Sequence, residues 1–300
     1  MPKVKNLLAE LPEPEIIDID ALKRSLAGGR TELVCVLGPT ASGKTRYAVQ
    51  LARELGGEII SADSRQVYRG MDIGTGKDLA EYGEIPYHII DVADPGDGFN
   101  VFRFKECFGK AFADIRSRGA VPILCGGTGL YINAVTSGYD FKSHKPLSAP
   151  RDDCGEGLFC QKTSASLHPP RKRVPPVLVA TGGHCFPAEE SLTAVPRTYF
   201  IGTLVSREVR NARIDARLDA RLQEGMIDEI KGLLDGGVPP SVLLAYGLEY
   251  KYVTLYLQGE LDYASMREKL AIAIHQFAKR QMTWFRGMER SGVVIHWTEV

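Results

Sequence analysis

The sequence predicts an α/β fold in which helices flank a parallel sheet, with an insertion and further helices toward the C-terminus. Three observations support this fold. Short β-branched runs alternate with stretches of helical apolar spacing, an order typical of parallel sheets. Two of these runs end directly in glycine-rich loops, and the longest helical patterns all lie in the last third of the chain.

Composition fits a full α/β domain with a smaller appendage. The 300 residues are 44% hydrophobic and 25% charged, as in an ordinary globular protein. The 37 basic side chains balance 37 acidic ones, so the formal net charge is zero. Bulk charge therefore does not indicate a nucleic-acid partner, and any such binding must come from local patches.

The sequence gives no indication of export. Its first twenty residues include two lysines but no apolar run of signal-peptide length, and no segment approaches membrane-spanning length. We therefore expect a cytoplasmic protein with no membrane partner. The six cysteines show no CxxC spacing and are expected to be free thiols, not bridges or a zinc site: Cys35, Cys107, Cys125, Cys154, Cys160 and Cys185.

The first elements of the core are a strand and a glycine-rich loop. Residues 1–30 form a polar lead-in, expected at the surface, with a short helix over Ile19–Ala27. The apolar, β-branched run Leu33–Leu37 predicts a buried strand. It is followed at once by a G-x-x-x-x-G-K-T motif: Gly38, Pro39, Thr40, Ala41, Ser42, Gly43, Lys44 and Thr45.

This motif is a phosphate-binding P-loop. Gly38 and Gly43 let backbone N–H groups wrap an anion, and the helix that starts near Lys44 points its positive end at the same anion. Lys44 adds a positive charge, and the Thr45 hydroxyl is placed to hold Mg²⁺. The motif leaves open whether the phosphate belongs to a nucleoside triphosphate or to another diphosphate.

The second and third strands are predicted between the P-loop and residue 92. A helix over 45–55 ends at paired glycines, and a β-prone run at 58–61 leads into Asp63. Because loops after strand carboxyl ends line the ligand crevice of such sheets, we expect Asp63 close to the P-loop. The run 86–92 predicts the third strand, and 100–118 predicts a helix.

The fourth predicted strand, 120–125, ends in a second glycine-rich loop that carries Thr128. Turn chemistry alone could explain this loop, but its position after a crevice-facing strand favours function. From 145 to 197 the periodicity is lost, and paired prolines exclude long helices locally. We interpret the one charge cluster in this stretch, 171–173, as a solvated loop and not as a specific phosphate contact.

Regular patterns return at 197–203, the fifth predicted strand. Helices are predicted over 207–235, 244–257 and 263–286, and a terminal strand over 293–297. We thus predict three parts: the lead-in 1–30, a core of 31–144 and 198–300 with a five-strand parallel sheet, and a degenerate insertion over 145–197.

Six motifs together resemble the tRNA dimethylallyltransferase (tRNA isopentenyltransferase) family. In chain order they are GPTASGKT, ADSRQVYRGMDIGTGK, GGTGLYINAV, RIDARLDARLQEGMIDEI, AYGLEYKYVTLYLQG and FAKRQMTWFR. The resemblance covers about residues 32–142 and 198–297. It implies a P-loop NTPase-like core and transfer of the dimethylallyl group of dimethylallyl diphosphate to N6 of the adenosine 3′ of the anticodon. It also implies a monomer whose partner is the tRNA anticodon stem-loop.

The resemblance also implies how the reaction is divided among residues. The P-loop, with Mg²⁺, would hold the diphosphate as the leaving group. Asp63 would be the general base for the N6 proton, because some acceptor must take that proton as the new bond forms. The alternative for Asp63 is a helix N-cap or a carboxylate one water away from Mg²⁺.

Other site residues follow from the same resemblance. Arg217 matches an arginine at the diphosphate, although Arg213 is close in register. Thr128 matches a residue that touches the acceptor adenosine, which must leave its stack to react. The expected contacts to the flipped nucleotide are Asp63, Ser64, Arg65, Gln66 and Thr128.

The stretch 145–197 departs from the family pattern. Members of the family carry there a mostly helical insertion with an arginine-rich, RAxE-like segment that grips the anticodon stem, and this motif is missing here. Three alternatives therefore stay open. They are an adenylate-type isopentenyltransferase that acts on free nucleotide, a P-loop kinase for a small molecule, and a catalytically defective tRNA-binding relative.

Overall fold

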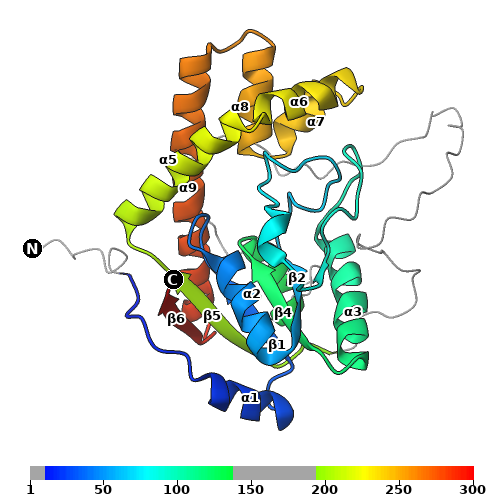
Figure 1. Ribbon diagram of the computed structural model, residues 1–300, viewed down its shortest axis with the longest axis vertical. Coiled ribbons are helices and arrows are strands. Elements are labelled where there is room, and N and C mark those ends of the chain that lie inside the picture. Colours follow the sequence, from blue (N-terminus) through cyan, green and yellow to red (C-terminus); the bar gives the residue numbers. More distant parts are fainter. Residues whose placement is uncertain (1–10, 138–193) are drawn as a thin grey trace, which may run out of the picture.

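A single parallel sheet organises the fold in the computed structural model, which describes residues 11–137 and 194–300 (Figure 1). Within these residues the strand order is β3-β2-β4-β1-β5-β6, and every pairing is parallel. The strands are β1 (Leu33–Leu37), β2 (Gly57–Ser61), β3 (Tyr87–His88), β4 (Val121–Gly126), β5 (Thr198–Leu204) and β6 (Ile295–Glu299). The predicted fold class is confirmed, but the count of five strands was wrong, because the terminal strand pairs with β5 as a sixth.

Helices cover both faces of the sheet. Because side chains alternate along a strand, Val34 and Val36 of β1 pack toward α2 on one face, while Cys35 packs in the cluster on the other. The latter cluster also holds apolar residues of α3, α4 and α9. The first four helices are α1 (Ile19–Ala27), α2 (Lys44–Leu55), α3 (Val101–Ser117) and α4 (Gly129–Thr136).

The lead-in packs against the sheet domain and is not merely the surface appendage that we predicted. The helix α1 has the predicted bounds, with Asp18 as its N-cap, and its Leu22 is only 2% exposed in the cluster that contains α2. The backbone N–H of Glu15 also donates to the carbonyl of Trp297 in β6. The described part of the lead-in therefore packs against the sheet domain.

Five helices form the C-terminal part, and Figure 1 shows α6, α7 and α8 gathered beyond the sheet. Two predicted helices are each divided at a glycine. The pattern over 207–235 breaks at Gly225 (φ 102°), and the pattern over 244–257 breaks at Gly247 (φ 142°), conformations that other residues rarely adopt. The helices are α5 (Arg207–Gln223), α6 (Met226–Asp235), α7 (Pro240–Ala245), α8 (Leu248–Leu257) and α9 (Tyr263–Arg290).

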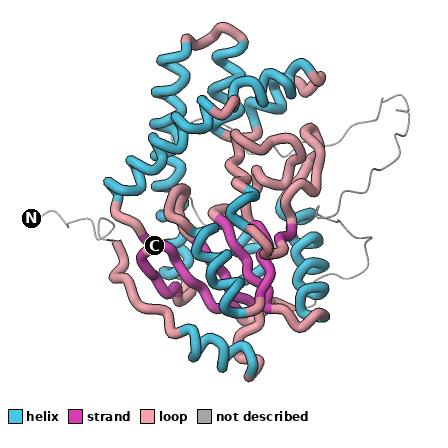
Figure 2. Tube along the Cα trace, in the orientation of Figure 1, coloured by secondary structure: helices cyan, strands magenta, loops and turns pink. Residues whose placement is uncertain are grey.

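The third strand is much shorter than predicted. Only Tyr87–His88 pairs with β2, because Ile89 (φ 63°) and Asp91 (φ 56°) turn the chain away. The N–H of Val92 donates instead to the carbonyl of Val67. The long loops between β2 and α3 are thereby held beside the C-terminal helices, as the loop segments in Figure 2 show.

Three of the expected free thiols are confirmed in the described residues: Cys35, Cys107 and Cys125 are buried and unbridged. The other three cysteines and nearly all of the predicted insertion lie outside the described residues. Among the helices that the structure describes, none combines the length and apolarity needed to cross a membrane.

Candidate active site

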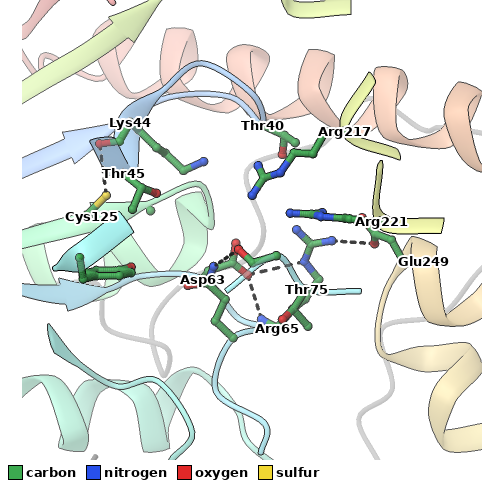
Figure 3. Close-up of a pocket in the computed structure, with 14 residues that line it drawn as sticks. Thr40, Lys44, Thr45, Asp63, Arg65, Thr75, Cys125, Arg217, Arg221 and Glu249 are labelled. Atoms are coloured by element: carbon green, nitrogen blue, oxygen red, sulfur yellow. Dashed lines mark hydrogen bonds and ion pairs between the residues drawn. The ribbon is translucent and has the colours of Figure 1, made fainter. Parts of the chain in front are cut away.

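A pocket lies where the P-loop, the loop after β2 and the helices α5 and α8 meet (Figure 3). The empty space in it, open mouth included, is about 520 Å³. As predicted, Asp63 and the P-loop line the same pocket. The lining residues are Thr40, Lys44, Thr45, Asp63, Arg65, Gln66, Thr75, Gly76, Tyr82, Cys125, Gly126, Arg217, Arg221 and Glu249.

The P-loop is a tight turn that packs against β5. Ala41 (φ 63°) and Gly43 (φ 85°) turn the backbone, and the helix α2 then begins at Lys44. A Cβ at Gly38 would stand 2.2 Å from Oγ1 of Thr203, so only glycine fits there. Ser42 is fully buried, and its hydroxyl pairs with that of Thr203 at 2.6 Å.

Lys44 and Thr45 project into the pocket from the start of α2 (Figure 3). Lys44 forms no ion pair with a described residue, and burial lowers the pKa of its ammonium. No side-chain cap closes the N-terminus of α2. Free backbone donors, the helix dipole and an unpaired lysine therefore converge on one point, which is the arrangement of an anion site.

Opposite the P-loop, Asp63 belongs to a partly buried charge network. Its Oδ1 accepts a hydrogen bond from the backbone N–H of Arg65 at 3.0 Å and lies 3.6 Å from the Arg65 guanidinium. Arg65 also donates to Glu249 of α8 at 2.9 Å. Burial alone would lower the pKa of Arg65, but the charges of Glu249 and Asp63 raise it above its usual range. Arg65 is therefore a fixed cation beside Asp63.

Ser64 and Thr128 meet beside this pocket, although neither lines it. Oγ1 of Thr128, at the N-terminus of α4, accepts from the backbone N–H of Ser64 at 3.1 Å. Gln66 does line the pocket, but both ends of its amide are already bonded, to the Ser61 hydroxyl and to the Gly76 carbonyl. Of the predicted nucleotide contacts, Asp63, Arg65 and Gln66 therefore line the pocket, whereas Ser64 and Thr128 do not.

The choice between the two candidate arginines of α5 favours Arg217. Arg217 lines the pocket and forms an ion pair with Asp78, whereas Arg213 is exposed and is not a lining residue. Burial, together with the neighbouring charges of Arg221 and Arg65, lowers the pKa of Arg217 to about 10. An anion near these cations would offset that cost.

Several lining residues were missed by the sequence analysis. Cys125 is the next-to-last residue of β4, and burial raises the pKa of its thiol to about 12, so the thiol is an unreactive part of the pocket wall. Arg221 lies one helical turn after Arg217, a spacing visible in the sequence. Glu249 gave no such signal, because its place depends on how α8 packs.

The site fits a Mg²⁺ ion held in part by a phosphate ligand. Among the described residues, no group of three or more histidine, cysteine or acidic side chains could hold a metal by itself. Mg²⁺ usually keeps several waters and binds one or two protein oxygens together with substrate phosphates. The Thr45 hydroxyl beside the anion site is suited to that role.

Comparison with known protein families gives a consistent result. A family model described as IPP transferase matches residues 66–181 and 172–288, and a second, described as isopentenyl transferase, matches residues 31–84. Together these matches reach from the first strand of the sheet almost to the end of α9.

Similar proteins extend over most of the chain. A protein of Porphyromonas gingivalis named tRNA dimethylallyltransferase 1 is 49% identical over 282 residues, covering 89% of this chain and 93% of its own length. A protein of the same name from Geotalea uraniireducens is 50% identical over 279 residues, with 89% and 92% covered. The crystal structure of a tRNA isopentenylpyrophosphate transferase of Bacillus halodurans superposes with a TM-score of 0.67 at 29% identity, covering 90% of each chain.

Proposed function

Because the chain belongs to the IPP transferase family, we propose that it transfers the dimethylallyl group of dimethylallyl diphosphate to N6 of the adenosine 3′ of the tRNA anticodon. The observation that carries the proposal is one pocket in which Lys44 and Thr45 face Arg217 and Asp63. An anion cradle and a carboxylate on opposite sides of one space suit a reaction that releases diphosphate and a proton together.

The proposed reaction is a substitution at the allylic carbon of dimethylallyl diphosphate. The N6 lone pair forms a bond to the allylic carbon, the bond from that carbon to the diphosphate oxygen breaks, and its electron pair leaves with the diphosphate. The N6 proton passes to the carboxylate of Asp63. Lys44, Arg217 and the P-loop N–H groups stabilise the charge that develops on the leaving oxygen. Mg²⁺, held by Thr45 and the diphosphate, would add charge neutralisation at the same place.

The acceptor nucleotide is bound by Thr128 and by the residues that follow Asp63. The hydrogen bond between Thr128 and Ser64 joins the second glycine-rich loop to the Asp63 loop. The two loops therefore form one surface that can contact a nucleotide base. A stacked anticodon base must be flipped out of its stack to reach Asp63. Arg65, fixed by Glu249, would contact the nucleotide as a preorganised cation.

The names of the matched relatives favour tRNA over free nucleotide as the acceptor, and prenyl transfer over phosphoryl transfer. We further propose that the enzyme works in the cytoplasm, where its tRNA substrate is found, and as a monomer. Sedimentation of the purified chain, with and without an anticodon stem-loop RNA, tests the second point.

The test of the proposed function is transfer of labelled dimethylallyl to an anticodon stem-loop RNA with Mg²⁺. We expect label on the RNA with the wild type, and a loss of at least about a hundredfold with Asp63→Asn, the scale of removing a general base. Asp94→Asn is the matched control, because the Asp94 side chain is exposed and pairs only with Arg69 among described residues. Removing Mg²⁺ with a chelator should also slow transfer.

Three other outcomes would replace the proposal. Label on AMP, ADP or ATP but not on RNA would indicate an adenylate-type enzyme. Phosphoryl transfer to a small molecule without prenyl transfer would indicate a kinase. Salt-dependent RNA binding without any turnover would indicate a defective relative.

A further inference from the structure

We propose that Arg221 is a second guanidinium contact for the diphosphate, and that Asp78 is an internal counter-ion that the diphosphate displaces. Asp78 lies against both Arg217 and Arg221. The proposal rests on the proposed function, since it deepens the description of the same pocket. It adds a binding residue and a competition to that site.

The first argument is the burial of Arg221 without adequate partners. Its side chain is only 11% exposed, and its Nη2 is buried with no hydrogen-bond partner among the described residues. Burial lowers the pKa of this guanidinium, with Glu249 acting in the opposite direction. A buried guanidinium nitrogen without an acceptor costs stability, so such groups call for an explanation. A ligand that accepts a hydrogen bond from this nitrogen provides that explanation.

The second argument is that the protein leaves room for the Arg221 head group. A Cβ at Gly76 would stand 1.8 Å from Nη2 of Arg221, and Gly76 has a φ of +66° that favours glycine. The guanidinium therefore packs against the backbone of the loop after β2, while Arg221 also lines the pocket. Its position is fixed before any ligand arrives, which lowers the entropy cost of binding.

The third argument is the pairing of Arg221 with Arg217. The two residues are four apart on α5, so their side chains share one face of the helix. Figure 3 shows both guanidiniums extending into the pocket from the side opposite Lys44 and Thr45. Burial and, second to it, the charge of Arg221 lower the pKa of Arg217, as expected for two cations on one helix face.

The charges around the pocket favour a polyanion. Among the lining residues, the carboxylates of Asp63 and Glu249 both pair with Arg65, and the four lining cations outnumber these two carboxylates by two. The remaining lining cations are Lys44, Arg217 and Arg221. Three cations around one space suit a diphosphate, which carries two adjacent phosphate groups, better than they suit a single carboxylate.

Asp78 is not a lining residue of the pocket, but it pairs with both of these arginines. Its carboxylate is ion-paired with Arg217 and lies 3.6 Å from Nη2 of Arg221. Asp78 has a φ of 30°, a left-handed conformation, and its side chain is 41% exposed, so it can turn to solvent when a stronger anion binds. Asp78 and the diphosphate therefore compete for the same two guanidiniums.

The test is binding of inorganic pyrophosphate with Mg²⁺ to the full chain, measured by calorimetry. We expect Arg221→Met to weaken binding by about tenfold to a hundredfold, the scale of losing a charge-assisted hydrogen bond. Asp78→Asn should tighten binding, by up to about fivefold, the scale of a partly exposed ion pair. Arg207→Met is the matched control, because Arg207 is an exposed arginine at the start of α5.

The two variants move the measurement in opposite directions, which a general loss of folding cannot do. Pyrophosphate affinities equal to wild type in Arg221→Met would overturn the proposal, as would weaker binding in Asp78→Asn. If Arg221→Met instead weakens binding of the anticodon stem-loop RNA alone, the residue contacts a nucleic-acid phosphate and the proposal is wrong. Absence of pyrophosphate binding by the wild type would count against the proposed function itself, as distinct from this inference.

Discussion

Gln281 of α9 holds Thr40 of the P-loop by two hydrogen bonds. Its Oε1 accepts from the Thr40 backbone N–H at 2.8 Å and from the Thr40 hydroxyl at 3.1 Å. Its Nε2 donates to the carbonyl of Gly127 at 3.0 Å. A single amide, 7% exposed, thus joins the C-terminal helix to both glycine-rich loops of the site.

Replacing Gln281 should loosen both loops at once. Gln281→Leu leaves the partly buried N–H of Thr40 and the buried carbonyl of Gly127 without these partners, so we expect a loss of roughly 1–3 kcal/mol in the free energy of unfolding. We also expect weaker pyrophosphate binding, because the P-loop is less well ordered. Urea unfolding and calorimetry measure the two effects. Gln276→Leu, at an exposed position of the same helix, should change neither, and a Gln281→Leu protein with wild-type stability would contradict the argument.

The P-loop could be predicted because its determinants are local. The strand β1 and the helix α2 are joined by the loop alone, and α2 begins at Lys44 as predicted. The position of Asp63 also followed from a general rule, since loops at strand carboxyl ends meet at one edge of a parallel sheet. Neither inference needed the position of a distant element.

The residues that escaped prediction depend on distant packing. Glu249 reaches the site only because α8 packs beside the Asp63 loop, and Gln281 reaches Thr40 across 241 residues of sequence. The breaks at Gly225 and Gly247 were missed because apolar spacing continues through both glycines. The shortening of β3 was missed because its β-prone residues pair with a loop in place of a strand.

Glu229 of α6 anchors the loop that follows β2. Its carboxylate accepts from the backbone N–H groups of Asp72, Ile73 and Gly74 at 2.7 to 3.1 Å, and from the hydroxyl of Tyr250 at 2.7 Å. A carboxylate can serve four donors, whereas a side-chain amide in its place would bring its own N–H groups against them.

The substitution Glu229→Gln should therefore destabilise the protein by roughly 1–3 kcal/mol. Hydrogen exchange should be faster at residues 72–76, because this loop loses its anchor. Glu224→Gln, at an exposed position at the end of α5, is the control and should leave both quantities unchanged. Unchanged exchange in the Glu229→Gln variant would show that the loop is held by other contacts.

Gly38 is required by the close approach of β5. In Gly38→Ala the new Cβ would stand 2.2 Å from Oγ1 of Thr203 and 2.6 Å from Oγ of Ser42, both buried. We expect a loss of roughly 1–3 kcal/mol from overpacking, and a partial recovery in the double variant with Thr203→Ala. Gly98→Ala is the control, since a Cβ there meets no atom within 4 Å. Strictly additive effects in the double variant would rule out the contact as the cause.

The charged form of Lys44 should lower the free energy of unfolding and strengthen anion binding, so both quantities should depend on pH. Burial lowers its pKa below the usual 10.5, so between the lowered value and 10.5 the folded protein releases a proton that the unfolded chain keeps. The free energy of unfolding should therefore rise with pH across this window, while pyrophosphate affinity falls as the ammonium loses its charge. Lys44→Met should lack this rise in the free energy of unfolding. Without ligand it should be more stable than wild type near neutral pH, and it should bind pyrophosphate poorly at every pH.

Urea unfolding and calorimetry from about pH 7 to 10.5 measure these changes, and Lys23→Met, at an exposed position, is the control. A Lys44→Met protein less stable than wild type at neutral pH would show that the ammonium is stabilised by the fold and not held there for an anion.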